Sequence, residues 1–169
     1  MKKLLLTFIV FLCSIVMFAG PLKKTSGDDK CFSENVTAVL SMDLSKTTFD
    51  KKQSFKTWCG KDYDERVSVS KKGFTESFNQ NSKGLKIVDS EDDAKYKIVI
   101  DVKNFQRKSA SFGFGRYHVK VYGTLTVIDN ATGETVCAYD IDGVSGGDDF
   151  VETERFEKSF SELGKVLLK

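Results

Sequence analysis

The stretch Ala94–Gly143 contains three alternating segments, AKYKIVIDVKNFQ (94–106), RYHVKVYGTLTVID (116–129) and ETVCAYDIDG (134–143). In each segment apolar and polar residues alternate, which is typical of a β-strand with one buried face. A glycine-rich turn joins the first two segments, and an Asn-Ala-Thr-Gly turn that suits a hairpin joins the last two. The stretch predicts a three-stranded antiparallel meander around which the rest of the chain is organised.

The alternation also predicts which side chains of the meander face the core. One face of the first two strands is apolar, and the other carries lysine, aspartate, histidine and threonine. A buried apolar face and a solvent-exposed polar face are the usual pattern of an antiparallel sheet. The residues predicted to face the core are Tyr96, Ile98, Ile100, Val102, Val119, Val121, Gly123, Leu125, Val127, Cys137, Tyr139 and Ile141.

The segments before the meander predict a strand, a helix and a second strand. Residues 36–44 alternate as a half-buried strand, and apolar residues then recur at helical spacing from Asp62 onward. The polar segment 79–84 ends this helix, and residues 85–88 form a short strand. A strand, a helix and a strand in this order predict a right-handed crossover between parallel strands.

A last helix is predicted at the end of the chain. Asp148 or Asp149 is expected to cap it, and its apolar face consists of Phe156, Phe160, Leu163 and Leu167. Two amphipathic helices on one face of a mixed sheet predict an α+β fold, a two-layer α/β sandwich. We expect residues 35–169 to form this single domain after a flexible lead-in over residues 21–34.

The first twenty residues have the features of a secretory signal peptide. A short basic start is followed by the apolar run Leu4–Phe18 and then by the small residues Ala19 and Gly20. The run is shorter than the roughly 20 apolar residues of a membrane span. We expect cleavage after Ala19 or Gly20 and a periplasmic or secreted protein.

Cys13 raises the question of a lipid anchor. Leu12 directly before it is too bulky for a lipobox, and the apolar run continues to Phe18. The sequence therefore leaves membrane association open but contains no lipobox.

The charge of the chain argues against nucleic acid as a partner. The formal net charge is +2, and removal of the leader with its two lysines lowers it to about zero. A nucleic-acid binder should carry a concentrated basic face, whereas lysines and acidic residues are interspersed here.

Three cysteines, Cys31, Cys59 and Cys137, lie beyond the leader. Their spacing does not match a Cys-x-x-Cys or Cys/His metal motif. Cys137 is expected to be a small core residue. A disulfide between Cys31 and Cys59 would stabilise the fold by roughly 3.5 kcal/mol on the chain-entropy model. The alternative is that all three are free thiols.

The segment 46–60 reads as a long polar loop that carries Phe49, Phe55 and Trp58. Such loops are uncommon in small domains unless they pack as a flap or have a function. We expect the aromatic residues to cover the edge of the core. The alternative is a flap over a pocket for a small ligand or a lipid.

Candidate catalytic and metal-binding residues are few. His118 is the only histidine, and a histidine acts as a catalytic base only where a nucleophile or a substrate lies within its reach. Asp140, Asp142, Asp148 and Asp149 do not match the ligand spacing of a calcium loop. The sequence therefore predicts no catalytic, metal or cofactor site, and it disfavours a hydrolase.

The turn between the first two strands of the meander is a candidate contact site. Phe112 and Phe114 alternate with glycines, and Arg116 follows them. Exposed aromatic residues on a turn are candidate anchors for a protein partner. The alternative is that both phenylalanines fold back over the sheet.

The order of elements is similar to that of the amino-terminal domain of TolB and of the periplasmic domain of the curli secretion channel CsgG. More closely, DAKYKIVIDVKNF, VYGTLTVIDNATGETVCAYDIDGVSG and the closing SFSELGKVLLK resemble small uncharacterised secreted or lipid-anchored proteins of Gram-negative bacteria. The resemblance covers residues 36–169 and implies a fold and a compartment. Its motifs are structural, so it carries over no functional residue.

From these observations we expect a non-enzymatic envelope protein that binds or assembles with another envelope protein. The contact would be an exposed sheet edge or the turn with Phe112 and Phe114. The alternative is a carrier of a small ligand or lipid with a pocket under residues 46–60. The sequence does not indicate which molecule such a carrier would bind.

Overall fold

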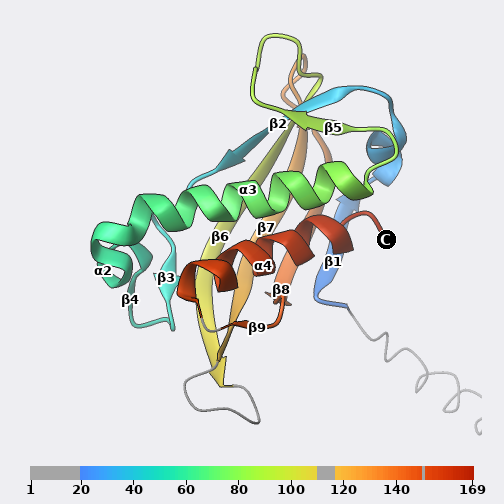
Figure 1. Cartoon of the computed structure of the whole chain (residues 1–169). Coiled ribbons are helices and arrows are strands. Elements are labelled where there is room, and N and C mark those ends of the chain that lie inside the picture. The colour runs from blue at the N-terminus through green and yellow to red at the C-terminus, as the bar shows by residue number, and fades with distance from the viewer. Residues whose placement is uncertain (1–19, 110–116, 150) are drawn as a thin grey trace, which may run out of the picture.

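The computed structural model describes residues 20–109, 117–149 and 151–169, and Figure 1 shows the arrangement of their helices and strands. The elements are β1 (Leu22–Gly27), the 3₁₀ helix η1 (Asp29–Ser33), β2 (Thr37–Met42), β3 (Thr48–Phe49), β4 (Gln53–Ser54), α2 (Phe55–Cys59), the 3₁₀ helix η2 (Gly60–Asp62), α3 (Tyr63–Asn81), β5 (Lys86–Val88), β6 (Tyr96–Ser109), β7 (Tyr117–Asp129), β8 (Thr135–Val144), β9 (Asp148–Asp149) and α4 (Glu152–Val166).

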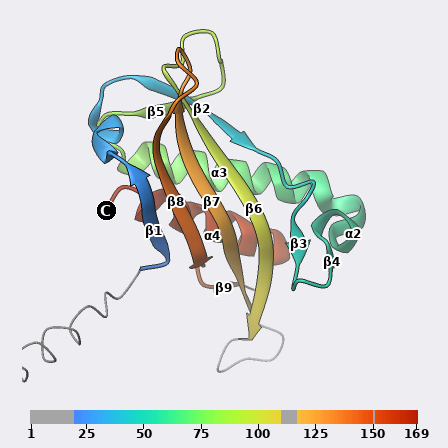
Figure 2. The same ribbon diagram turned by 180° about the vertical axis from the view of Figure 1, so that it is seen from behind.

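The fold is a two-layer α/β sandwich. One mixed sheet has the strand order β1-β8-β7-β6-β2-β5. Helices α3 and α4 lie side by side over one face of this sheet, and none of the described helices covers the opposite face (Figure 2). The α+β class, the mixed sheet and the two helices on one face are therefore confirmed.

The central meander is confirmed as well. β6, β7 and β8 pair antiparallel in sequence order. The register between β6 and β7 shifts between Val102 and Asn104. Because of this shift, Phe105 is fully buried after the alternating core residues Tyr96, Ile98, Ile100 and Val102. The side-chain oxygen of Asn104 accepts hydrogen bonds from the Thr48 hydroxyl and the Lys51 N–H, both at 2.9 Å.

The crossover before the meander places parallel strands next to each other. β2 pairs parallel with β5 on one side and with β6 on the other. α3 connects β2 to β5 and buries one face that includes Phe74 and Phe78. The predicted strand, helix and parallel strand are therefore present.

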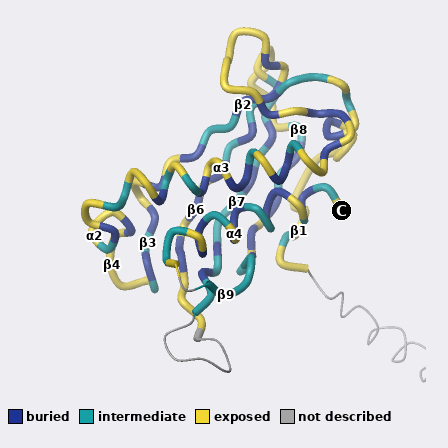
Figure 3. Tube along the Cα trace, viewed as in Figure 1, coloured by how far each residue is buried: buried dark blue, intermediate teal, exposed yellow. Residues whose placement is uncertain are grey.

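The core lies between the sheet and the two helices, and Figure 3 shows that buried positions alternate with exposed ones along α3 and α4. At one end of the core, five phenylalanines from the sheet, α2 and α4 are at most 1% exposed. Ring centroids in this group lie about 4.6 to 6.5 Å apart, which is the range of favourable aromatic contacts. These phenylalanines are Phe49, Phe55, Phe105, Phe156 and Phe160.

The prediction of a flexible lead-in over residues 21–34 is wrong. β1 pairs antiparallel with β8, from Leu22 with Ile141 to Gly27 with Cys137. The 3₁₀ helix η1 follows and buries Cys31 and Phe32. This segment is held by backbone hydrogen bonds to a sheet edge, and the side chains of β1 are largely exposed.

The prediction of a loop over residues 46–60 is also wrong in part. β3 and β4, which have two residues each, form a hairpin, and α2 follows with Ser54 as its N-cap. The expected burial of the aromatic residues is confirmed, because Phe49 and Phe55 are at most 1% exposed. Phe49 stacks on Trp58 with ring centroids 3.7 Å apart. The segment is thus part of the core and not a flap.

The prediction that Asp148 or Asp149 caps the last helix is wrong. These residues form the short strand β9, which pairs with Tyr117 and His118 of β7. Val151 occupies the N-cap position of α4 and makes no side-chain cap hydrogen bond. The predicted apolar face is confirmed, since Phe156, Phe160, Leu163 and Leu167 are all buried.

Two predictions fall on residues outside the described ranges. The signal peptide lies almost entirely within residues 1–19, and Phe112, Phe114 and Arg116 lie within residues 110–116. Both therefore stay predictions. Within the described part of the chain, no helix combines the length and the apolar character needed to cross a membrane.

Candidate functional site

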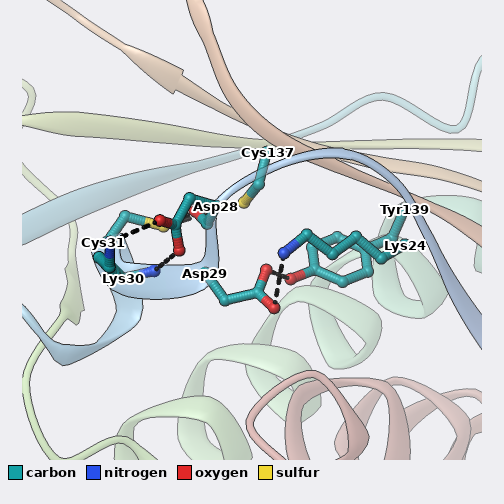
Figure 4. A network of polar contacts seen from close by, with 7 residues as sticks. All are labelled: Lys24, Asp28, Asp29, Lys30, Cys31, Cys137 and Tyr139. Atoms are coloured by element: carbon teal, nitrogen blue, oxygen red, sulfur yellow. Dashed lines mark hydrogen bonds and ion pairs between the residues drawn. The ribbon is translucent and has the colours of Figure 1, made fainter.

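Two buried cysteines meet where η1 packs against β8. Figure 4 shows Cys31 of η1 beside Cys137 of β8, and their sulfur atoms are 3.8 Å apart. Both side chains are at most 1% exposed. Cys31 also lies 3.9 Å from the backbone carbonyl oxygen of Asp28. The pairing of β1 with β8 brings the two thiols together from positions 106 residues apart.

Charged and phenolic groups surround this pair of thiols. The Tyr139 hydroxyl donates a hydrogen bond to Asp29, and Lys24 forms an ion pair with Asp29 at 3.0 Å (Figure 4). The Asp28 side chain accepts a hydrogen bond from the Lys30 N–H at 3.1 Å. These contacts join the end of β1, the start of η1 and β8 into one network.

The two thiols influence each other's ionisation. The pKa of Cys31 lies above its ordinary range, because Cys31 shares its hydrogen with Cys137 and because burial disfavours a thiolate. The pKa of Cys137 is lowered, because a thiolate there would accept the hydrogen bond from Cys31. The pKa of Tyr139 is raised by burial and by its hydrogen bond to Asp29.

The predicted disulfide between Cys31 and Cys59 is wrong. Cys59 ends α2 at the opposite end of the sandwich, whereas η1 lies near β1 and β5 (Figure 1). Cys59 is buried, and burial raises the pKa of its thiol. Cys31, Cys59 and Cys137 are all free thiols in this structure. The prediction that Cys137 is a small core residue is confirmed, since it is fully buried.

A second polar cluster lies near Cys59, at the start of α4. Arg66 of α3 is 6% exposed, and one of its terminal nitrogens lies 2.6 Å from a carboxylate oxygen of Glu152. The guanidinium group also lies 4.7 Å from the centre of the Trp58 ring. Tyr117 donates a hydrogen bond to the other carboxylate oxygen of Glu152. The cluster therefore links α3, α4 and β7. It also gives the buried guanidinium group of Arg66 an acidic partner.

Arg155 completes the cluster from α4. Its guanidinium carbon lies 3.6 Å from the centre of the Tyr117 ring, and its Nε donates a 2.6 Å hydrogen bond to the backbone oxygen of Asp149. A cation over an aromatic face stabilises the pair. These two contacts of Arg155 hold β9 and the start of α4 against the sheet, which is a structural role.

Tyr117→Phe tests this network through pH. Burial and the hydrogen bond to Glu152 raise the pKa of Tyr117 to about 12, above the value of about 10 for an unfolded chain. The folded state thus keeps the phenolic proton that the unfolded state loses, so this stabilisation is present below pH 10 and is lost between about pH 10 and 12. We expect urea unfolding to show a shallower loss of stability from pH 9.5 to 11 in the variant. Parallel profiles for the two proteins would contradict this.

One face of the sheet is not covered by α3 or α4 (Figure 2). Cross-strand neighbours form rows on it: Ser41, Val99, Thr126 and Ala138 form one row, and Asp101, Thr124 and Asp140 form the next. Tyr122 lies beside them, opposite Asp142. All of these side chains are intermediate or exposed. We call the set Ser41, Val99, Asp101, Tyr122, Thr124, Thr126, Ala138 and Asp140 the uncovered face.

Among the described residues, aromatic side chains fill the space beneath residues 46–60. Phe55 is fully buried there, and its ring centroid lies 4.6 Å from that of Phe105 and 5.3 Å from that of Phe156. A groove of about 400 Å³ does lie between α3 and α4. Polar and charged side chains such as Glu76 and Glu157 line it, in contrast to the mostly apolar lining of small-molecule sites.

The candidate catalytic and metal-binding residues lie on β7, β8 and β9. His118 is half-buried in β7 and pairs with Asp148 of β9 in the backbone ladder. Asp140 and Asp142 are exposed on β8, whereas the Asp149 side chain accepts a hydrogen bond from the Val151 N–H. Within the described ranges, no group of three or more histidine, cysteine or acidic residues is placed to hold a metal ion.

Comparisons with known proteins give likenesses in structure only. No protein-family model and no curated protein sequence matches the chain. A PelC variant from Paraburkholderia phytofirmans, solved as a dodecamer, is 15% identical with a TM-score of 0.46, over 89% of this chain and 100% of that one. A DUF330 protein from Xanthomonas campestris is 12% identical with a TM-score of 0.42, over 85% and 88%.

A minor lipoprotein from Acinetobacter baumannii is more distant, at 12% identity and a TM-score of 0.30, over 79% of this chain and 90% of that one. With TM-scores below 0.5, these likenesses carry no argument about function. The resemblance to TolB and CsgG stays a prediction.

Proposed function

We propose that the protein is a non-enzymatic, exported protein of the cell envelope that binds another protein through the uncovered face. The observation that carries this proposal is the one-sided helix layer, which leaves a broad sheet surface facing outward (Figure 2). Its central row combines Val99, Thr126 and Ala138, which are small or apolar and half-exposed. Tyr122 adds an aromatic side chain of the type enriched at protein interfaces.

The charges around this row favour a protein as the partner. Asp101 and Asp140 lie on the face itself, and Lys103 forms an ion pair with Asp101. Lys23 of β1 is the neighbour of Asp140. Because both signs are mixed, the face lacks the concentrated basic charge that nucleic acid or an anionic membrane surface attracts. A protein surface with charges of both signs matches it.

The two edges of the sheet are less suited to the contact than the face. Open sheet edges can add a strand from a partner, but β1 has a register shift between Lys24 and Ser26 and exposes two lysines. Bulges and lysines are features that discourage pairing at an edge. The other edge strand, β5, is three residues long. The face is therefore preferred over an exposed edge, and the turn with Phe112 and Phe114 stays a second candidate contact.

Thr126→Arg tests the proposal, because it places a long charged side chain in the centre of the uncovered face. A strand accepts this change at a half-exposed position, so we expect stability to change by less than about 1 kcal/mol. We expect recovery of the partner from envelope extracts of the source organism to fall at least about tenfold, since a misplaced charge at an interface costs several kcal/mol.

The matched control is Ser68→Arg, which adds the same side chain on the exposed side of α3. It should leave recovery of the partner unchanged. Two further measurements distinguish other occupants: sedimentation of the purified protein reports self-association, and flotation with anionic vesicles reports lipid binding. Equal recovery with both variants would overturn the proposed surface.

A further inference from the structure

We infer that Cys31 and Cys137 form a disulfide bond when the chain meets an oxidising environment. The two sulfur atoms are already in contact at 3.8 Å, and an approach of about 2 Å would bring them to the S–S bonding distance of about 2.05 Å. The inference goes beyond the proposed binding function. It rests on that proposal only where it concerns the compartment in which oxidation would occur.

The positions of the two residues suit a covalent link. Cys31 lies in η1, which follows β1, and Gly27 at the end of β1 is the ladder neighbour of Cys137. The N-terminal segment is attached to β8 at the sheet edge, where the side chains of β1 contribute little burial. A bond from Cys31 to Cys137 would therefore fasten this largely exposed edge strand to the meander. Asp29 and Tyr139 already connect the same two segments by a hydrogen bond.

Both sulfur atoms are enclosed in the folded protein, so oxidation must occur while the N-terminal segment is open. Five of the six residues of β1 are exposed, and edge segments with few buried contacts open locally at low free energy. Oxidation can also occur during folding, before β1 and η1 dock on β8. After docking, reductants reach the bond only when this segment opens or the chain unfolds, as it does in thermal unfolding.

The chemistry requires an oxidant that itself carries a disulfide, such as a thiol–disulfide oxidoreductase or oxidised glutathione. The Cys137 thiolate attacks one sulfur of the oxidant, which forms a mixed disulfide and releases the other sulfur as a thiol. The Cys31 thiolate then attacks the sulfur of Cys137 and releases the second thiol. The two cysteines together lose two electrons and two protons, and the oxidant gains both. The same balance holds if the Cys31 thiolate attacks the oxidant first and Cys137 completes the bond.

The third cysteine is not expected to take part. Cys59 lies at the far end of the sandwich, beside Arg66, whose terminal nitrogen lies 3.4 Å from the Cys59 backbone oxygen. Three cysteines follow the leader, so one of them stays unpaired when Cys31 and Cys137 form a disulfide. That cysteine is Cys59, which is only 5% exposed and therefore not a surface thiol.

The test uses the full chain with Cys13→Ser, so that Cys31, Cys59 and Cys137 are its only thiols. The protein is purified reduced and then equilibrated with oxidised and reduced glutathione. After trapping of free thiols and tryptic digestion, mass spectrometry should find peptide 31–46 linked to peptide 121–155. The peptide 57–61 should carry the trapping reagent. Three trapped thiols at equilibrium, or a link that includes peptide 57–61, would overturn the inference.

Thermal unfolding gives a second readout that needs no change at the buried cysteines. A link between residues 106 apart in sequence restricts the unfolded chain strongly, so dithiothreitol should lower the Tm of the oxidised protein by on the order of 10 °C. Cys59→Ser is the matched control and should keep both the cross-linked peptide and the Tm shift. In Cys31→Ala, the reductant should have no effect on the Tm. A Tm of the oxidised protein that dithiothreitol leaves unchanged would count against the bond.

Different results would contradict the disulfide inference and the proposal that the protein is exported. The same thiol trapping, applied to the protein in its source cells, reports the compartment. If the bond forms with glutathione but is absent in the cells, the disulfide inference stands and the export proposal fails.

Discussion

Phe156→Ala should destabilise the protein by about 3–5 kcal/mol, the range for deletion of a fully buried aromatic side chain. Phe156 is completely buried and links the sheet, α2 and α4. Its ring centroid lies 5.1 Å from that of Phe105, 5.3 Å from that of Phe55 and 6.0 Å from that of Trp58. The loss is a large fraction of the 5–15 kcal/mol that holds a typical domain together.

Urea unfolding followed by the fluorescence of Trp58, the only tryptophan, measures this loss directly. The matched control is Val151→Ala, because Val151 precedes the same helix and is 48% exposed. It should change stability by less than about 0.5 kcal/mol. A loss below about 1 kcal/mol for Phe156→Ala would indicate a loosely filled core. That result would restore the alternative of a ligand pocket beneath residues 46–60.

Gly73→Ala should destabilise the protein by about 2 kcal/mol, although alanine favours a helix over glycine by about 1 kcal/mol. The reason is the close contact of α3 with α4. A Cβ atom at Gly73 would lie 2.4 Å from the backbone oxygen of Glu157, and one at Gly164 would lie 2.8 Å from that of Phe74. The two helix backbones must separate to accept either methyl group, which would loosen the layer over the core.

The matched control is Ser68→Ala, on the exposed side of α3. It should raise stability by a few tenths of a kcal/mol, because it improves helix propensity without a steric contact. Chemical denaturation of both variants gives the comparison. A stabilising effect of Gly73→Ala, as in an ordinary exposed helix, would show that α3 and α4 are less closely packed than described.

Most of the fold could be predicted because it rests on periodic burial. Apolar residues alternate along β6, β7 and β8, and Phe74, Phe78, Phe156 and Phe160 recur at helical spacing. Both patterns indicate which side chains are buried. These residues do line the core. Phe105 departs from the alternation only because the register shifts at Asn104, a backbone feature that side-chain pattern alone does not reveal.

Elements held by the backbone could not be predicted in the same way. β1 is formed by hydrogen bonds to β8, and its exposed Lys, Thr and Ser side chains give no periodic signal. The hairpin of β3 and β4 turns at Asp50 and Lys51, which have φ of 54° and 56°, and no glycine marks this turn. β9 consists of two aspartates directly before a helix. Aspartate at this place is typical of a helix N-cap, so the sequence predicts a cap and not a strand.

The two candidate sites, the uncovered face and the pair of thiols, also differ in how far the sequence predicts them. The uncovered face follows from the polar half of the alternation, so Asp101, Thr124 and Thr126 could be placed on it from the sequence. The contact between Cys31 and Cys137 could not, because it depends on how β1 pairs with β8 across 106 residues of sequence. Sequence distance alone makes Cys59 the nearer candidate partner of Cys31, and the structure contradicts a bridge between them.

The central claim, that the uncovered face binds another protein, is tested most directly by a photo-crosslinking amino acid placed at Thr126 in living cells of the source organism. Ser68, on the exposed side of α3, is the matched position. We predict a defined crosslinked product with a second, different protein from position 126 and none from position 68. Products from position 68 alone, or products at position 126 that contain only lipid or a second copy of this chain, would contradict the claim.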